Sequence, residues 1–337
     1  MLCFKSRIVY SKVIFLIDMD NYLMNPITKV KTKIKSFIKH IVDTEVDKRV
    51  NEIVSNLPAI LEAQNCPDED KQSFYDLSKN PEKNYQKVLK LKSQLEELGV
   101  TVQEEQIQIE AYERWKNNFP EITSKYKSLG DVSEEKCLEH YITYTYLDLK
   151  NSECFLDVAA AGSPFVDILN NKNINSYRLD LVYPSGIHGK NIGGNACDSG
   201  LDDNFVSSMA LHCAYECFQG DADIKLMKEA GRILKPKGSM GIIPLYIDEI
   251  YYNSTSPFCN QDEIPFDSEA KKIWRDDTFK VPFSRHYSPE AFYNRILKQT
   301  PSSLETKILF FSNLPELMDH YTGQRIYCYF LLLTTKK

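Results

Sequence analysis

Asp157 and Asp180 are the two acids of this sequence that are best placed to bind a nucleotide-like ligand. Asp157 lies in the apolar run Cys154–Val158, which is followed by the small residues of the turn Ala159–Ser163. Asp180 lies twenty-three residues after Asp157, at the end of the segment Asn175–Leu179. A buried strand, a tight turn and the start of a helix favour a nucleotide-like cofactor, and an acid after the next strand can bind its ribose.

The segments after Asp180 alternate between strand and helix patterns. We expect strands over Val206–Cys213 and Ser239–Tyr246, with an amphipathic helix over Asp223–Leu234 between them. Lys235–Gly238 ends that helix, because proline and glycine cannot continue it. Strands that alternate with helices indicate a mostly parallel sheet, which must position the two acids at one edge.

This order of elements resembles the class I S-adenosylmethionine-dependent methyltransferases, and more narrowly a subgroup with a D-[VI]-A-x-x-x-S-P first turn. Four ordered segments carry the resemblance: Asp157–Ser163, Asp180, Gly194-Asn195-Ala196 and Arg232–Gly238. The resemblance implies an α/β fold with a doubly wound, mostly parallel, seven-stranded Rossmann-like sheet, and S-adenosylmethionine as cofactor. The cofactor-binding residues that it implies are Asp157, Ala159, Ala161, Gly162, Ser163, Asp180, Asn195, Ala196 and His212.

The chain departs from the family pattern in three places. Ala159, Ala161 and Ser163 stand where the family usually has glycines, so the backbone can approach a cofactor less freely. Asn195 replaces an acid that commonly contacts adenine, although an amide can still bind through its oxygen or its NH₂ group. Cys217 follows Glu216 where many relatives carry histidine. A catalytically degenerate methyltransferase-like scaffold is therefore the alternative to an enzyme.

The candidate catalytic residues lie near the ends of the fourth and fifth strands. A sulfonium methyl is already activated, so the protein must mainly orient the acceptor and accept a proton. His212 is the first candidate for a base, or else a residue that shapes the pocket, and Glu216 lies nearby. Arg285 could clamp a carboxylate or phosphate of the acceptor; a surface salt bridge to Asp276 or Asp277 is the alternative.

The helix before the first core strand is a further candidate. In the resembled family this segment lies over the cofactor, so Glu139, His140 or Tyr141 could touch its methionine end. Alternatively, the tyrosines are packing residues and His140 is an ordinary surface side chain. We expect this helix to begin at Ser133, as an N-cap residue followed by acids in the first turn.

Composition limits the classes of acceptor and the cellular locations that we expect for this protein. The formal net charge of −6 argues against a general nucleic-acid binder, so we expect a small-molecule or glycan-like acceptor. Nine cysteines show neither disulfide-framework nor zinc spacing, and we expect no bound metal and a reducing, cytoplasmic location. The first apolar run, Val13–Ile17, is too short to span a bilayer.

We expect two parts: a helical N-terminal extension over residues 1–130 and a methyltransferase domain over 131–337, with an insertion at about 248–282. From Ile27 onward apolar residues recur every three or four positions, which predicts a long amphipathic helix, broken near Asp43. Its lysines suit a membrane surface, a partner helix or a solvated face, and the helix could self-associate.

The sequence also predicts a linker and several further helices and strands. The polar stretch Cys66–Pro81 is a predicted linker, and the final run is predicted to be the antiparallel strand of the sheet. The other predicted elements are helices over Pro81–Leu98 and Glu104–Asn117, a helix capped by Ser288 with Pro289 in its first position, and strands over Leu304–Phe311 and Arg325–Thr334.

Overall fold

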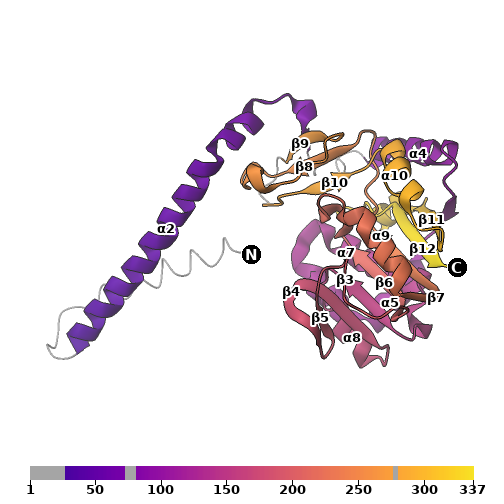
Figure 1. Cartoon of the computed structure of the whole chain (residues 1–337), viewed down its shortest axis with the longest axis horizontal. Helices are drawn as coiled ribbons and strands as arrows, with labels where there is room; N and C mark the ends of the chain where they lie inside the picture. Colours follow the sequence, from indigo (N-terminus) through magenta and orange to yellow (C-terminus); the bar gives the residue numbers. More distant parts are fainter. Residues whose placement is uncertain (1–26, 73–80, 276–279) are drawn as a thin grey trace. The chain divides into compact units, whose positions relative to one another are not determined.

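The computed structural model describes residues 27–72, 81–275 and 280–337 (Figure 1). The chain divides into two compact units: the first ends at Leu57, and the second runs from Pro58 to Lys337. Asp276, Asp277 and the apolar run Val13–Ile17 lie outside the described residues. The predicted boundary at residue 130 stays a prediction.

Helix α2 (Ile27–Asn65) is the long helix that the apolar periodicity predicts. It is continuous through Asp43, so the predicted break is wrong. The apolar pattern changes phase there, but no proline or glycine interrupts the backbone hydrogen bonds at that point. The only proline inside α2 is Pro58. In the described part of the chain, no helix is both long enough and apolar enough to cross a membrane.

An eight-stranded sheet forms the centre of the second unit, in the order β2-β11-β12-β7-β6-β3-β4-β5. β12 runs antiparallel to both of its neighbours, and the other pairs are parallel. The strands are β2 (Val102–Glu105), β3 (Phe155–Val158), β4 (Ser176–His188), β5 (Asn191–Gly193), β6 (Val206–His212), β7 (Leu234–Ile243), β11 (Leu304–Phe311) and β12 (Phe330–Lys336).

The chain reverses its direction of travel across this sheet after β5. From β3 it moves outward through β4 to β5, and it then returns to the other side of β3 to form β6 and β7 (Figure 1). The point between β3 and β6 is therefore the switch point of the sheet, where the carboxyl ends of the strands leave a crevice. The doubly wound, mostly parallel fold expected from the sequence is confirmed.

Strand β2 is an eighth strand that the sequence pattern did not predict. It pairs in parallel with β11 at the edge of the sheet, and helix α5 (Ile109–Asn118) follows it. The predicted helix over Glu104–Asn117 is thus wrong at its start, because Glu104 and Glu105 lie in β2. Edge pairing with β11 is a long-range contact that local propensity cannot indicate.

The helices bury their apolar faces against this sheet. Buried side chains of α4 and α7, such as Leu91, Leu95, Leu138 and Ile142, belong to one continuous hydrophobic core with the strands. The helices are α4 (Pro81–Glu97), α5, α6 (Pro120–Tyr126), α7 (Ser133–Tyr146), α8 (Phe165–Asn171), α9 (Ala222–Ile233), α10 (Pro289–Arg295) and α11 (Leu314–His320).

Two predicted caps have different outcomes. Ser288 caps α10 as predicted, because its hydroxyl accepts a hydrogen bond from the amide of Ala291 at 3.1 Å. Ser133, in contrast, is already the first residue of α7, and Val132 occupies the cap position. The Ser133 hydroxyl instead donates to the side chain of Gln324 at 3.1 Å, so the cap prediction is wrong there.

A second, four-stranded sheet has the order β1-β9-β8-β10, and the predicted insertion over about 248–282 supplies two of its strands, β8 and β9. Its strands are β1 (Lys71–Gln72), β8 (Tyr252–Thr255), β9 (Lys271–Arg275) and β10 (Ser284–His286). β1 comes from the predicted linker Cys66–Pro81 and pairs in parallel with β9. The linker prediction is therefore wrong at Lys71 and Gln72, since a distant strand supplies their partners.

The last strand starts later than the sequence predicts. Its antiparallel direction is confirmed, but Arg325 precedes β12 by five residues. The backbone amides of Tyr327 and Cys328 donate to the Glu135 carboxylate of α7, at 2.9 and 3.3 Å. This buried carboxylate satisfies backbone donors that would otherwise need a neighbouring strand.

Candidate functional site

A cavity of about 620 Å³ opens at the carboxyl ends of β3, β5 and β6, beside residues 179–181 of β4. It lies at the switch point of the sheet, and its volume suits a ligand of nucleoside size. The residues that line it are Ala159, Leu179, Asp180, Leu181, Gly194, Asn195, Ala196, Cys197, Cys213, Ala214, Cys217, Phe218, Gln219 and Ala222.

The first turn leaves β3 in an unusual backbone conformation. Ala159 has φ = 56°, in the left-handed region that glycine adopts readily and that alanine adopts at a cost. Its amide donates to the carbonyl of Leu179 at 2.8 Å, which links the turn to β4 at the point where the pairing of β3 and β4 stops. Ala161 and Gly162 are exposed, and the Ser163 hydroxyl accepts from the amide of Phe165 at 3.2 Å.

Asp180 joins the second strand to this turn. One carboxylate oxygen accepts from the amide of Ala161 and the other from the amide of Val182, each at 3.1 Å. A carboxylate has about four acceptor sites, so these two bonds leave capacity for hydroxyl donors of a ligand. The structure therefore brings together the turn and the acid that the sequence singles out.

The segment after β5 completes the cavity wall. The side-chain oxygen of Asn195 accepts from the amide of Cys197 at 3.0 Å, which leaves its NH₂ group as the available donor. Ala196 and Gly194 line the cavity beside it. Of the two binding modes left open by the sequence, donation through NH₂ fits this local geometry.

His212 lies beneath the turn with both ring nitrogens engaged. Its Nδ1 is 3.0 Å from a carboxylate oxygen of Asp157, and its Nε2 is 2.9 Å from the hydroxyl of Thr143. The ring centre of His140 lies 4.3 Å away. The second oxygen of Asp157 is buried and has no hydrogen-bond partner among the described residues. This oxygen therefore keeps unused acceptor capacity two residues before Ala159, which lines the cavity.

Buried acids of α7 extend this polar region. Glu135 and Glu139 are buried, and Glu139 forms an ion pair with Lys136 at 2.7 Å. Burial raises the pKa of both carboxyl groups, although Lys136 opposes the shift. His140 is also buried, which holds its pKa well below the usual value. The reading of His140 as an ordinary surface residue is therefore wrong.

Cys213 connects the cavity to a third buried acid. It lies directly after β6 with φ = 48°, and its thiol contacts the Glu216 carboxylate at 3.3 Å and the Tyr246 hydroxyl at 3.5 Å. Burial raises the pKa of Glu216, and the second oxygen of this carboxylate has no hydrogen-bond partner in the described chain. Glu216 thus contacts Cys213, which lines the cavity.

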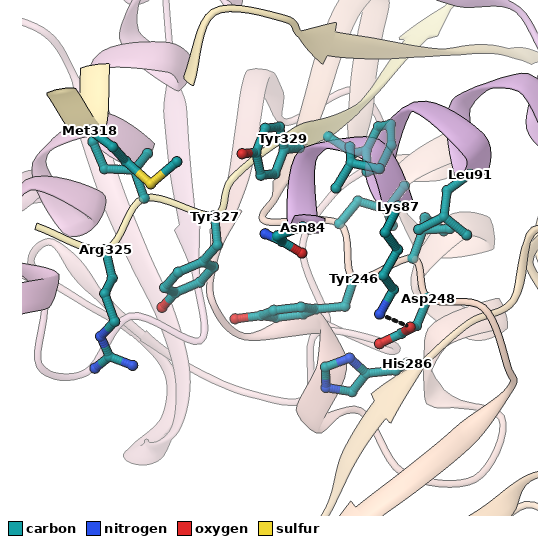
Figure 2. A pocket seen from close by; sticks show the side chains of 15 residues that line it. Asn84, Lys87, Leu91, Tyr246, Asp248, His286, Met318, Arg325, Tyr327 and Tyr329 are labelled. Atoms are coloured by element: carbon teal, nitrogen blue, oxygen red, sulfur yellow. Dashed lines mark ion pairs between the residues drawn. The ribbon is translucent and has the colours of Figure 1, made fainter. Parts of the chain in front are cut away.

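A second, smaller cavity of about 70 Å³ lies on the other side of Tyr246. Figure 2 shows Tyr246, Tyr327 and Tyr329 around it, with Lys87 of α4 reaching Asp248 in a 2.5 Å ion pair. The ring of His286 lies 4.7 Å from that of Tyr246, centre to centre. Because Tyr246 contacts Cys213, it stands between the two cavities.

Arg285 lies apart from both cavities. Its side chain is fully buried and forms ion pairs with Asp223 at 2.9 Å and Asp267 at 2.7 Å. It also donates to the carbonyls of Phe218 and Gly220, at 2.6 and 2.8 Å. The surface salt bridge considered from the sequence is wrong, since a buried Arg285 joins the small sheet to the loop before α9.

Sequence reasoning missed Glu135, Lys136 and Thr143. Glu135, Glu139 and Thr143 are spaced by four on α7, which places them on one helix face beside the buried Ile142. That spacing was the available signal. All eight described cysteines are free thiols, and the described residues contain no group of three or more His, Cys, Asp or Glu side chains that could hold a metal.

The order and directions of the strands decide the fold. Seven of the eight strands, with β12 antiparallel between β7 and β11, form the sheet that the family resemblance implies. The second unit has the class I methyltransferase fold. β2 adds an edge strand to it.

Comparisons with known proteins find solved structures of low identity and low TM-score. No family model and no curated protein matches the sequence. A Burkholderia thailandensis 1,6-didemethyltoxoflavin-N1-methyltransferase, solved with S-adenosylhomocysteine, is similar at 14% identity over 59% of this chain and 76% of that one, with a TM-score of 0.36. A Methanosarcina mazei S-adenosylmethionine-dependent methyltransferase is similar at 13% identity over 58% of this chain and 96% of that one, with a TM-score of 0.35. An Archaeoglobus fulgidus S-adenosylmethionine-dependent methyltransferase is similar at 15% identity over 59% of this chain and 91% of that one, with a TM-score of 0.34.

Proposed function

We propose that this protein is an S-adenosylmethionine-dependent methyltransferase with a small-molecule or glycan-like acceptor. The observation that carries the proposal is the Asp180 carboxylate, which is bonded to the amide of Ala161 at the rim of the switch-point cavity. An acid in this place is suited to the two hydroxyl groups of a ribose.

Asp180 and Asn195 in the wall of the switch-point cavity, and Asp157 buried behind it, fit the parts of this cofactor. Asp180 would accept from the ribose, and the NH₂ group of Asn195 would donate to the adenine edge. The unpartnered oxygen of Asp157 would accept from the ammonium group of the methionine part. S-adenosylmethionine would supply an activated methyl group on a sulfonium centre.

We propose that the acceptor approaches from the small cavity beside Tyr246. This cavity is lined by three tyrosines and by the ion pair of Lys87 and Asp248 (Figure 2), which suits a ligand with apolar and hydrogen-bonding groups. About 70 Å³ admits only part of a molecule, since a water occupies about 30 Å³ of liquid. The rest of the acceptor would then lie outside.

The three candidate catalytic residues have different proposed roles. Glu216 is our candidate proton acceptor, because its raised pKa favours proton uptake and one oxygen is unpartnered. His212 would position the turn through Asp157, since both of its nitrogens are engaged. Arg285 would hold the small sheet in place rather than clamp the acceptor.

Titration calorimetry with S-adenosylmethionine and S-adenosylhomocysteine tests the cofactor assignment. We expect saturable binding to the wild-type protein and a rise in its thermal midpoint. Absence of both at millimolar ligand, with a folded protein, would overturn the proposal. Glu216→Gln is expected to keep cofactor binding and to lower methyl transfer to pooled acceptors about 10²–10⁴-fold.

The second candidate function is a methyltransferase-like scaffold that binds no cofactor. The observation that favours it is Ala159 at φ = 56°, where the backbone and its methyl group crowd the approach to the turn. The same calorimetry distinguishes the two candidates. Ala159→Gly should strengthen cofactor binding if the cavity is an active site, whereas a scaffold would bind no cofactor in either form.

A further inference from the structure

One buried polar group of the small cavity beside Tyr246 has no partner inside the described protein. Tyr329 lines this cavity and is 2% exposed, and its hydroxyl has no hydrogen-bond partner among the described residues (Figure 2). A buried hydroxyl without a partner lowers the stability of the fold, so packing alone does not account for it. A ligand that reaches this hydroxyl would supply the missing hydrogen bond.

The other polar groups of the small cavity include both donors and acceptors. Asn84 of α4 lines the cavity, and Figure 2 shows its amide above the ring of Tyr246. A side-chain amide offers two donors and an acceptor oxygen, and the ion pair of Lys87 and Asp248 adds an ammonium group and a carboxylate. Hydroxyl groups of a ligand both donate and accept, so they match this mixture.

The charges at the small cavity compensate one another. Lys87 pairs with Asp248, which also lines the cavity. Arg325 pairs with Asp131 at 2.7 Å. Burial lowers the pKa of His286 to about 4, so this imidazole is neutral near pH 7. A charged group of the acceptor would meet no unpaired opposite charge among the described lining residues, and burying such a group is unfavourable. The cavity therefore favours a neutral ligand.

Two partly exposed tyrosine rings add an apolar surface to the same space. The ring centres of Tyr246 and Tyr327 are 6.3 Å apart, and the rings are inclined by 25°. A tyrosine ring can pack against the C–H groups on one face of a sugar, while the hydroxyls at the edge of the sugar bond to polar neighbours. An entirely apolar acceptor would leave the Tyr329 hydroxyl without a partner.

We propose that the small cavity binds a neutral sugar of the acceptor, with its C–H face on Tyr246 and its hydroxyls bonded to Tyr329 and Asn84. This inference rests on the proposed methyltransferase function, because it concerns the acceptor of that reaction. The cavity of about 70 Å³ holds one edge of a terminal sugar ring, and the rest of the acceptor stays outside. Sugars that carry a carboxylate or an amino group bind less tightly.

Saturation-transfer NMR on the protein loaded with S-adenosylhomocysteine tests this class of acceptor. The probes are the methyl glycosides of glucose, galactose and mannose, each compared with its uronic acid and its 2-amino sugar. We expect at least one neutral glycoside to bind, with roughly 10-fold weaker binding of its charged counterparts. Preference for a charged sugar, or binding of none while S-adenosylhomocysteine binds, would overturn the inference and leave the cofactor assignment standing. A folded protein that binds no S-adenosylhomocysteine would overturn the proposed function, and this inference with it.

Tyr329→Phe separates a ligand-binding role of the hydroxyl from a structural one. Because the hydroxyl has no partner among the described residues, its removal should leave the thermal midpoint unchanged or raise it. The neutral glycoside should bind roughly 2- to 13-fold more weakly, as expected for the loss of one neutral hydrogen bond. Tyr321→Phe is the matched control, since the Tyr321 hydroxyl donates to Glu113 and does not line the cavity. This control should lower the midpoint and leave sugar binding unchanged. A Tyr329→Phe variant that behaves like the control would overturn the inference.

Discussion

The carboxylate of Asp180 accepts a hydrogen bond from the backbone amide of Ala161 at 3.1 Å. Asp180 belongs to β4, one residue beyond its last pair with β3, and Ala161 belongs to the turn after β3. The contact lies at the wall of the switch-point cavity and holds the turn against β4. A ligand in this cavity would meet the acid and the turn together.

We expect Asp180→Ala to weaken S-adenosylmethionine binding. Hydrogen bonds to a charged group contribute about 1.5–3 kcal/mol, so the loss should be roughly 10- to 150-fold in Kd. The measurement is calorimetric titration. Asp202→Ala is the matched control, because Asp202 is exposed and does not line the cavity, and it should bind as the wild type does. Equal affinities for both variants would place the ribose site elsewhere.

Gly193→Ala should destabilise the protein by about 1–3 kcal/mol or more, as expected for an overpacked site. A methyl group at position 193 would lie 1.9 Å from the carbonyl oxygen of Pro184, a backbone atom that cannot rotate away. Chemical denaturation gives the free energy of unfolding. Gly162→Ala is the control, since a methyl group there meets nothing within 4 Å. Unchanged stability of Gly193→Ala would mean that the 181–188 segment moves freely.

Arg285→Ala should lower the free energy of unfolding by about 3–5 kcal/mol, because the buried Asp223 and Asp267 lose one of the two arginines that pair with them, the other being Arg295. Arg49→Ala, which removes an exposed pair with Glu45, should cost less than about 1 kcal/mol. Thermal and chemical denaturation measure both. A stable Arg285→Ala variant that has lost only activity would instead support the acceptor clamp expected from the sequence.

Acid should destabilise the protein through His286. Burial lowers the pKa of this imidazole to about 4, whereas it is about 6.5 in the unfolded chain. Between these values the unfolded chain binds more protons, so this contribution to stability is complete above pH 6.5 and is lost as the pH falls toward 4. The 2.5-unit difference corresponds to roughly 3 kcal/mol.

Denaturation of the wild type and of His286→Gln at several pH values measures the contribution of His286 to the free energy of unfolding. Other buried groups titrate in both proteins, and the raised pKa values of Glu135 and Glu216 act in the opposite direction. The difference between the two proteins should therefore shrink between pH 6.5 and 4. A difference that does not vary with pH would mean that His286 is already solvated in the folded state.

Local sequence signals were sufficient for the core strands and for the two acids of the first βαβ unit. Asp157 ends a short apolar run and lies in β3, whereas Asp180 follows the mixed segment Asn175–Leu179 and lies inside the longer strand β4. The same signals failed where a strand has few residues and a distant partner. β1 has two residues and β2 has four, so neither carries enough periodicity to be recognised.

The sequence by itself determined the order of the core elements, the antiparallel last strand and the residues around the turn, because apolar periodicity and turn chemistry are local properties. Only the tertiary structure decided which polar groups meet. It placed Arg285 on Asp223 and Asp267, and the amides of Tyr327 and Cys328 on Glu135. A buried charge or donor must find a partner, and that partner can lie anywhere in the chain.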